Sequence, residues 1–154
     1  MRQVTSRQNA LVARYRAAAR GEAAGLVLLD GVHLLAESLA AGLRIREAAI
    51  ASYAVDREEF KPIIRQLTAA GIDLVAASTS VMAALSPVRS SSPIVALAER
   101  PALTQARAGG GADLLVVAVD VQDPGNVGAI VRVAEAGGAT AVIIAGASAD
   151  PFGW

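Results

Sequence analysis

Short apolar segments alternate with segments of helical periodicity through the first hundred residues of the chain. Apolar side chains recur at intervals of three and four in the helical segments and run together in the strand segments. The expected order is a helix at 7–20 capped by Ser6, strand 26–29, helix 33–43, strand 45–52, helix 57–70, strand 72–76, helix 78–85 and strand 93–98. Pro62 either lies in the first turn of its helix or divides it. This alternation predicts that residues 1–99 form an α/β/α sandwich.

A second pattern begins at residue 114. Residues 114–119 and 141–145 are unbroken apolar strands, and a helix is expected between them at about 126–136, capped by Asn126. Continuous apolar strands joined by a helix are typical of a parallel βαβ unit that is covered on both faces. Two strands and one helix are too few for that covering. Residues 114–154 are therefore expected to be the start of an incomplete domain.

The segment 100–113 separates these two patterns. It is polar and rich in glycine and has no periodicity, which is typical of a linker. Its three consecutive glycines at 109–111 resemble a phosphate-binding loop, but they precede a strand and open no helix. The linker interpretation is therefore favoured.

Charge is distributed unevenly although the net charge is zero. Residues 1–20 contain five arginines and no acidic residue, whereas residues 101–154 contain two arginines and five acidic residues. Because attraction to phosphate is screened beyond about 8–10 Å, local charge matters more than the total. The basic first helix indicates either contact with RNA or an ordinary solvated helix, and charge alone favours the solvated helix.

Composition excludes several classes of site. The chain has no cysteine, so disulfide scaffolds, thiolate zinc sites and cysteine nucleophiles are excluded. His33 is the single histidine and is interpreted as a packing or capping residue, so no metal site is expected. No apolar run reaches the roughly 18 residues of a membrane span, and the polar start does not resemble a signal peptide. A cytoplasmic location is expected.

The most informative stretch runs from Asp123 to Ala139 and reads DPGNVGAIVRVAEAGGA. It places a turn and Asn126 at the carboxyl end of a predicted parallel strand, where ligands bind in open α/β sheets. Arg132 follows in the predicted helix. The first four residues alone would indicate only an ordinary turn and helix cap.

Taken whole, this stretch resembles the first signature motif of the SpoU/TrmH methyltransferases, Asn/Asp-Pro-x-Asn-x-Gly-x-Ile-x-Arg-Thr-Ala-x-x-Phe-Gly-Ala. Two positions differ, because Val133 stands at the usual Thr and Gly137 at the usual Phe. Further segments that are similar to the family are 5–12, 29–35, 81–98 and 149–152.

The resemblance implies a fold and a function. It implies an N-terminal RNA-binding domain with a ribosomal-protein-like fold in residues 1–99, followed by the first βαβ unit of a SPOUT α/β knot domain. It implies transfer of a methyl group from S-adenosylmethionine (AdoMet) to a ribose 2'-hydroxyl of structured RNA, with ribosomal RNA favoured, by a homodimer. The family's cofactor-binding segments are expected beyond Trp154, so the chain alone is expected to be inactive and not to bind AdoMet.

The resemblance also implies site residues. Arg132 and Asn126 are the catalytic candidates, and the RNA-binding candidates are Arg7, Asn9, Arg14 and Arg16. Because a guanidinium is practically never deprotonated, we expect Arg132 to stabilise developing negative charge rather than to act as a base. Two alternatives stay open: a non-catalytic RNA-binding module and, more weakly, an unrelated α/β nucleotide-binding protein.

Overall fold

The computed structural model describes residues 1–88, 92–102 and 114–153. The chain divides into two compact units, Met1–Pro101 and Ala102–Trp154, which are described separately. Most of the predicted linker, 100–113, lies outside the described residues. None of the helices in the described ranges is long and apolar enough to cross a membrane.

Unit 1 is built on a five-stranded mixed sheet in the order β1-β4-β3-β5-β2. Strands β1, β4 and β3 are parallel, and β5 runs antiparallel to its neighbours β3 and β2. The strands are β1 Arg2–Val4, β2 Leu26–Asp30, β3 Ile45–Ala51, β4 Asp73–Ala77 and β5 Ile94–Glu99.

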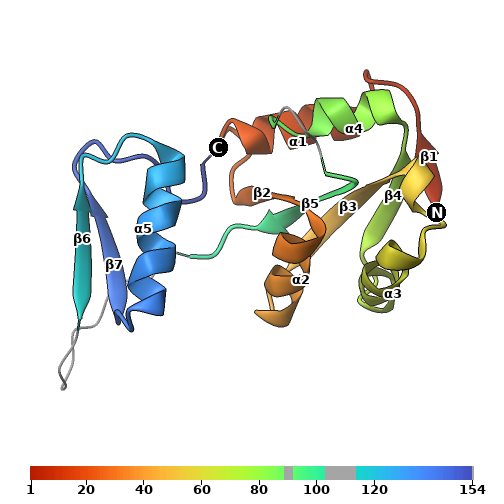
Figure 1. Cartoon of the computed structure of the whole chain (residues 1–154). Coiled ribbons are helices and arrows are strands. Elements are labelled where there is room, and N and C mark those ends of the chain that lie inside the picture. The colour runs from red at the N-terminus through yellow and green to blue at the C-terminus, as the bar shows by residue number, and fades with distance from the viewer. Residues whose placement is uncertain (89–91, 103–113, 154) are drawn as a thin grey trace. The chain divides into compact units, whose positions relative to one another are not determined.

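Helices cover both faces of this sheet (Figure 1). On one face lie α1 (Ala10–Ala19) and α4 (Thr79–Leu85), and on the other lie α2 (Val32–Ala40) and α3 (Lys61–Ala69). Two short 3-10 helices, η1 (Ser52–Ala54) and η2 (Glu58–Phe60), connect β3 to α3. The mixed α/β fold expected from the strand–helix alternation is confirmed.

Small aliphatic side chains dominate the core of unit 1. Ala48, Ala49 and Ala51 in β3 are fully buried or nearly so, which lets helices approach the sheet closely. The largest fully buried side chain is Tyr15 of α1, whose hydroxyl donates to the Glu47 carbonyl at 3.4 Å. Because a buried hydroxyl needs a partner, this contact fixes where α1 lies on β3.

The start of the chain differs from the sequence-based expectation. Residues 2–4 form strand β1 at the sheet edge, and Ser6 does not cap the first helix; its Oγ accepts a hydrogen bond from the Gln8 amide. Helix α1 begins three residues later, with Asn9 Oδ1 accepting from the Leu11 amide at 3.0 Å. The strand was missed because its first two residues, Arg2 and Gln3, are polar and solvent-exposed.

The segment predicted as one helix over 57–70 is divided. Residues 58–60 form η2, and α3 begins at Lys61 with Pro62 in its first turn, where a missing backbone donor costs nothing. The first-turn alternative for Pro62 is therefore confirmed. Ser78 caps α4 as expected, accepting from the Val81 amide.

Unit 2 contains two parallel strands joined by a helix. Strand β6 (Leu115–Val119) pairs in register with β7 (Ala141–Ala145), and α5 (Pro124–Ala136) buries Val127 and Ala134 against them. The predicted parallel βαβ arrangement is present. The strand residues that alternate away from α5 remain 36–56% exposed, and they are Leu115, Val117, Val119 and Ile143.

Candidate functional site

The loops that leave β6 and β7 meet at the carboxyl edge of the two-stranded sheet. Asp120 follows β6 with a φ of 58°, a left-handed conformation that is uncommon for a residue with a side chain. Its amide donates to the Ala145 carbonyl at 3.2 Å, and its Oδ1 accepts from the Ala147 amide at 2.7 Å. One residue of the first loop thus binds both ends of the turn after β7.

Ser148 adds a second connection between these loops. Its Oγ accepts from the Val121 amide at 3.0 Å and donates to the Ala145 carbonyl at 2.7 Å. The Ala149 amide donates to the Val121 carbonyl at 2.8 Å. Hydrogen bonds therefore join the two loops immediately before the chain enters α5.

Helix α5 is capped by Asp123 rather than by Asn126. Asp123 Oδ1 accepts from the Asn126 amide at 2.9 Å, and Pro124 occupies the first turn of the helix. The cap predicted at Asn126 is wrong, because the proline already takes a helical φ and moves the helix start two residues earlier. Asn126 is exposed, and its side chain is not used by the cap.

Arg132 lies two turns further along α5 and is exposed. Its Nη1 is 3.5 Å from the place that a Cβ at Gly128 would occupy, so the guanidinium lies back over that glycine toward the helix start. Asn126 and Arg132 both belong to the described residues, and no hydrogen bond joins them. The structure brings them onto the same helix without bringing them into contact.

An apolar groove lies at the other end of α5 and encloses about 380 Å³. It is lined by Leu114, Val116, Ala129, Ile130, Val133, Ala134 and Gly137. Gly137 stands where the family motif has an aromatic residue, and it forms part of this groove. AdoMet needs polar partners for its carboxylate, ammonium and adenine groups, and these lining residues offer none. The groove therefore does not fit AdoMet.

The four RNA-binding candidates of unit 1 have unequal surroundings. Arg7 is exposed and makes no ion pair with the described residues, whereas Asn9 is engaged as the cap of α1. Arg14 forms a bidentate pair with Glu47, with nitrogen–oxygen distances of 2.6 and 3.1 Å. Arg16 Nε donates to the Ala84 carbonyl at 3.2 Å.

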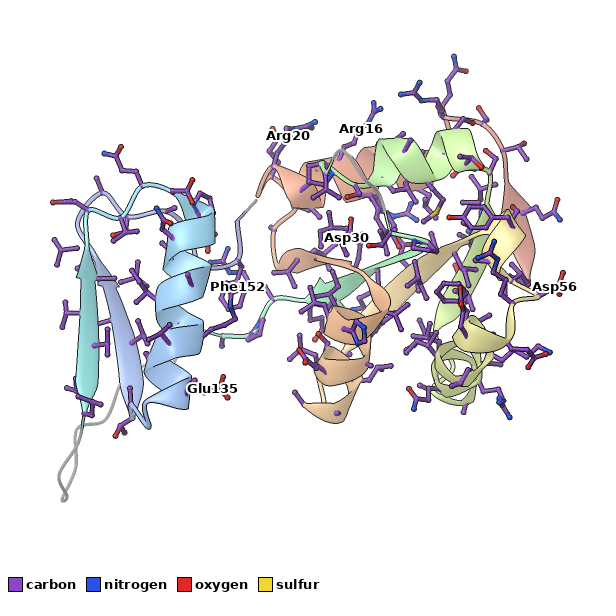
Figure 2. The ribbon with its side chains drawn as sticks, viewed as in Figure 1. Arg16, Arg20, Asp30, Asp56, Glu135 and Phe152 are labelled. Atoms are coloured by element: carbon purple, nitrogen blue, oxygen red, sulfur yellow. The ribbon has the colours of Figure 1, made fainter. Side chains whose placement is uncertain are left out.

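Several arginines of the basic first helix already have partners within the protein. The hydrogen bonds that Arg14 donates to the Glu47 carboxylate raise the pKa of Arg14 above its ordinary value, so this arginine is held by its partner. Arg20, which lies with Arg16 on the outer side of α1 (Figure 2), is paired with Glu22. The five arginines of residues 1–20 thus do not act as one unpaired basic surface.

Sequence reasoning did not single out Asp120, Gly146 or Ser148. The available signal was weak: an aspartate directly after an apolar strand, and a Gly-Ala-Ser turn after the next one. Asp is enriched several-fold among non-glycine residues at positive φ, but this preference does not reveal which distant turn the side chain will bind. In the described residues, no cluster of His, Asp or Glu is placed to hold a metal ion.

Solved structures with a similar fold include RNA methyltransferases. An rRNA methyltransferase from Sinorhizobium meliloti matches with a TM-score of 0.82 and 23% identity over 98% of this chain and 57% of that chain. An RNA 2'-O ribose methyltransferase matches with a TM-score of 0.76 and 29% identity over 97% of this chain and 57% of that chain.

A third match is the SpoU methyltransferase AviRb from Streptomyces viridochromogenes in complex with AdoMet. Its TM-score is 0.80 and its identity 25%, over 94% of this chain and 56% of that chain. No protein-family model matches the sequence. No curated protein matches it either. The chain spans a little over half the length of the solved structures it matches.

The fold and the sequence motif agree in the class of protein that they indicate. The chain joins a mixed α/β unit to a parallel βαβ unit that carries an Asp-Pro-Gly-Asn turn and an exposed arginine. In this fold and this motif, the chain is similar to RNA methyltransferases of the SpoU/TrmH type.

Proposed function

We propose that the chain is part of an RNA 2'-O-ribose methyltransferase that takes its methyl group from AdoMet. The similarity to an RNA 2'-O ribose methyltransferase at 29% identity supports the reaction. The AdoMet complex of a SpoU methyltransferase at 25% identity supports the donor. Residues 1–99 are the RNA-binding domain in this proposal, and 114–154 begin the methyltransferase domain. The protein acts in the cytoplasm as a homodimer, and ribosomal RNA is the favoured substrate.

The observation that carries this proposal is the placement of Arg132. Its guanidinium lies over Gly128 on the exposed side of α5. The helix itself starts directly after the two hydrogen-bonded loops at the carboxyl edge of the sheet. Ligands bind at this edge in open α/β sheets. A fixed positive charge there can stabilise the negative charge that develops on the ribose 2'-oxygen and can hold a neighbouring phosphate.

Asn126 has a different role in the proposal. Because Asp123 takes over the cap, the side-chain carboxamide of Asn126 is left to donate to or accept from a substrate group. The proposed division is therefore that Arg132 supplies charge, Asn126 supplies orientation, and the chain's described groove takes no part in holding AdoMet.

The rate of methyl transfer, compared between the wild-type protein and variants at Arg132, tests the proposal. The protein is produced in the longest form that its reading frame encodes and is incubated with ribosomal RNA and AdoMet carrying a labelled methyl group. Arg132→Ala should reduce the rate of transfer about 100-fold or more, as loss of one preorganised charged donor does. Arg132→Lys should recover only part of the rate, because the lysine ammonium lacks the planar, paired N–H donors of a guanidinium group.

The matched control for Arg132→Ala is Arg65→Ala. Arg65 is an exposed arginine on α3 whose one hydrogen bond within the described residues goes to the Lys61 carbonyl of its own helix. Its removal should leave the rate unchanged, and calorimetry should show AdoMet affinity unchanged in both variants. If wild-type protein binds RNA but transfers no methyl group, the non-catalytic RNA-binding module is the correct alternative. The separate core of unit 1 is the observation that favours this alternative.

A further inference from the structure

Two arginines contact the same carboxylate, that of Glu99 at the end of β5. Arg46 belongs to β3, and Arg44 directly precedes that strand. Arg44 Nε lies 3.6 Å from Glu99 Oε2, and Arg46 Nη2 contacts Glu99 Oε1. The Glu99 amide also donates to the Arg44 carbonyl at 2.8 Å, so the backbone holds the three residues together. We call Arg44, Arg46 and Glu99 the β3–β5 arginine patch.

A bulge shapes this patch. The register between β3 and β5 shifts between Ile45 and Glu47, which places Arg46 at the irregular position. A bulge redirects a side chain and often lies beside a functional surface. The side chains of Arg44 and Arg46 are 73% and 58% exposed, whereas Glu99 is 32% exposed. Both guanidinium groups therefore keep donors that face solvent.

The β3–β5 arginine patch has two arginines for one carboxylate, unlike other ion pairs of unit 1. Within residues 1–88 and 92–102, the pairs Arg2–Asp73, Arg14–Glu47 and Arg20–Glu22 each match one arginine to one carboxylate. Glu99 instead serves two arginines and leaves one positive charge uncompensated in the patch. Exposed ion pairs add little to stability, so folding alone does not account for this arrangement.

We propose that Arg44 and Arg46 bind RNA phosphate groups and that Glu99 holds them in place while competing with the phosphates. This inference rests on the proposed RNA substrate and adds a contact surface outside the first helix. The planar guanidinium group of an arginine binds phosphate with two hydrogen bonds. Two such groups held side by side fit an RNA backbone, which carries one negative charge per nucleotide. Glu99 ends β5, and unit 1 ends two residues later at Pro101, so the chain leaves unit 1 beside the patch.

Binding of a fluorescently labelled RNA hairpin, measured over a salt series, tests this surface in the whole chain. The double variant Arg44→Gln, Arg46→Gln should bind more weakly. The slope of log affinity against log salt should become shallower by about 0.7–0.9 for each arginine that contacts a phosphate. Glu99→Gln should have the opposite effect and tighten binding about threefold or more, because the competing carboxylate is gone.

The matched control for Glu99→Gln is Glu59→Gln. Glu59 pairs with exposed Arg57 at 3.5 Å beyond the other end of β3, so both variants add the same net charge. Equal tightening by the two variants, or an unchanged slope in the double arginine variant, would overturn the proposal. Thermal unfolding confirms that each variant is folded. Failure of the wild-type chain to bind the hairpin would instead count against the proposed RNA substrate itself.

Discussion

The carboxylate of Asp120 occupies the space that a side chain at Gly146 would need. A Cβ added at Gly146 would overlap Asp120 Oδ1 and would lie only 3.1 Å from Asp120 Cγ. Both residues also have left-handed backbones, with φ of 58° for Asp120 and 65° for Gly146. The loops after β6 and β7 are therefore fitted to each other at this one point.

Gly146→Ala should loosen these loops more than a left-handed glycine substitution ordinarily does. The left-handed backbone costs an alanine about 1–2 kcal/mol, and the overlap with Asp120 adds to this cost. Amide hydrogen exchange at Ala147 and in β7 should accelerate. Gly138→Ala is the matched control in the same unit, because Gly138 has a φ of 77° and open space around its Cβ position. Equal acceleration in both variants would contradict the role given to the Asp120 carboxylate.

Tyr15 should make unit 1 less stable at high pH. Burial raises the pKa of Tyr15 well above its ordinary value of 10.0, and the nearby Glu47 charge raises it further. A group whose pKa is raised on folding contributes fully below the unfolded pKa, and this contribution is lost as pH rises above about 10. Urea unfolding at pH 9 and pH 11 should show a steeper loss of stability for the wild type than for Tyr15→Phe. Parallel losses would contradict this linkage.

The strand and helix pattern predicted the fold well where the periodicity was strong. The four predicted strands of unit 1 all appear, because each of them contains several apolar residues that the core buries. The β6–α5–β7 arrangement appears as well. Strand β1 was missed because it is short, lies at the sheet edge and begins with Arg2 and Gln3. Its pairing with β4 depends on a partner more than seventy residues away, which local periodicity cannot report.

The site was harder to predict than the fold. The motif correctly indicated the helix that carries Arg132, but the cap was assigned to Asn126 because the preceding proline was not considered as the helix start. The contacts of Arg14 with Glu47 and Arg16 with Ala84 could not be foreseen, since charge counting does not reveal tertiary partners. The same limit hid the shared use of Glu99 by two arginines.

Residues 1–101 should fold without unit 2. Their core contains fully buried residues from helices and strands alike, among them Leu11, Leu35, Ile50 and Leu67. Such a core makes independent folding the expected outcome for a domain of this size. Circular dichroism should show a cooperative thermal transition for residues 1–101 that matches the one for unit 1 in the whole chain. A broad transition without cooperativity would show that unit 1 needs unit 2.

The arginines of the first helix should separate into two kinds in an RNA-binding assay. Arg7→Ala should make the slope of log RNA affinity against log salt concentration shallower by about 0.7–0.9, as expected for one lost phosphate contact. Arg14→Ala should instead destabilise the fold by about 1 kcal/mol, because Glu47, whose side chain is only 12% exposed, loses its partner. Salt titrations and urea unfolding of both variants check this separation. If Arg14→Ala changed the slope as Arg7→Ala does, without loss of stability, Arg14 would be an RNA contact.

Substitutions at Gly128 should reveal whether the guanidinium of Arg132 works from its observed position. A Cβ at Gly128 would lie 3.5 Å from Arg132 Nη1, an ordinary contact, so Gly128→Ala should keep methyl transfer in the longest encoded form of the protein. It should also stabilise α5 by up to about 1 kcal/mol, since alanine favours a helix over glycine. Gly128→Leu adds bulk where the guanidinium lies. It should reduce the rate of methyl transfer while leaving AdoMet affinity unchanged.

The control for Gly128→Leu is Ala136→Leu, which adds a similar side chain at an exposed position of α5. Arg132 extends toward Gly128 and away from Ala136, so Ala136→Leu should leave the rate unchanged. Single-turnover assays with ribosomal RNA give the rate, and calorimetry gives the AdoMet affinity. A Gly128→Leu protein that is folded and transfers methyl groups at the wild-type rate would show that Arg132 acts from another position. Loss of AdoMet affinity in that variant would place Arg132 on the cofactor side of the site, contrary to the role proposed for it.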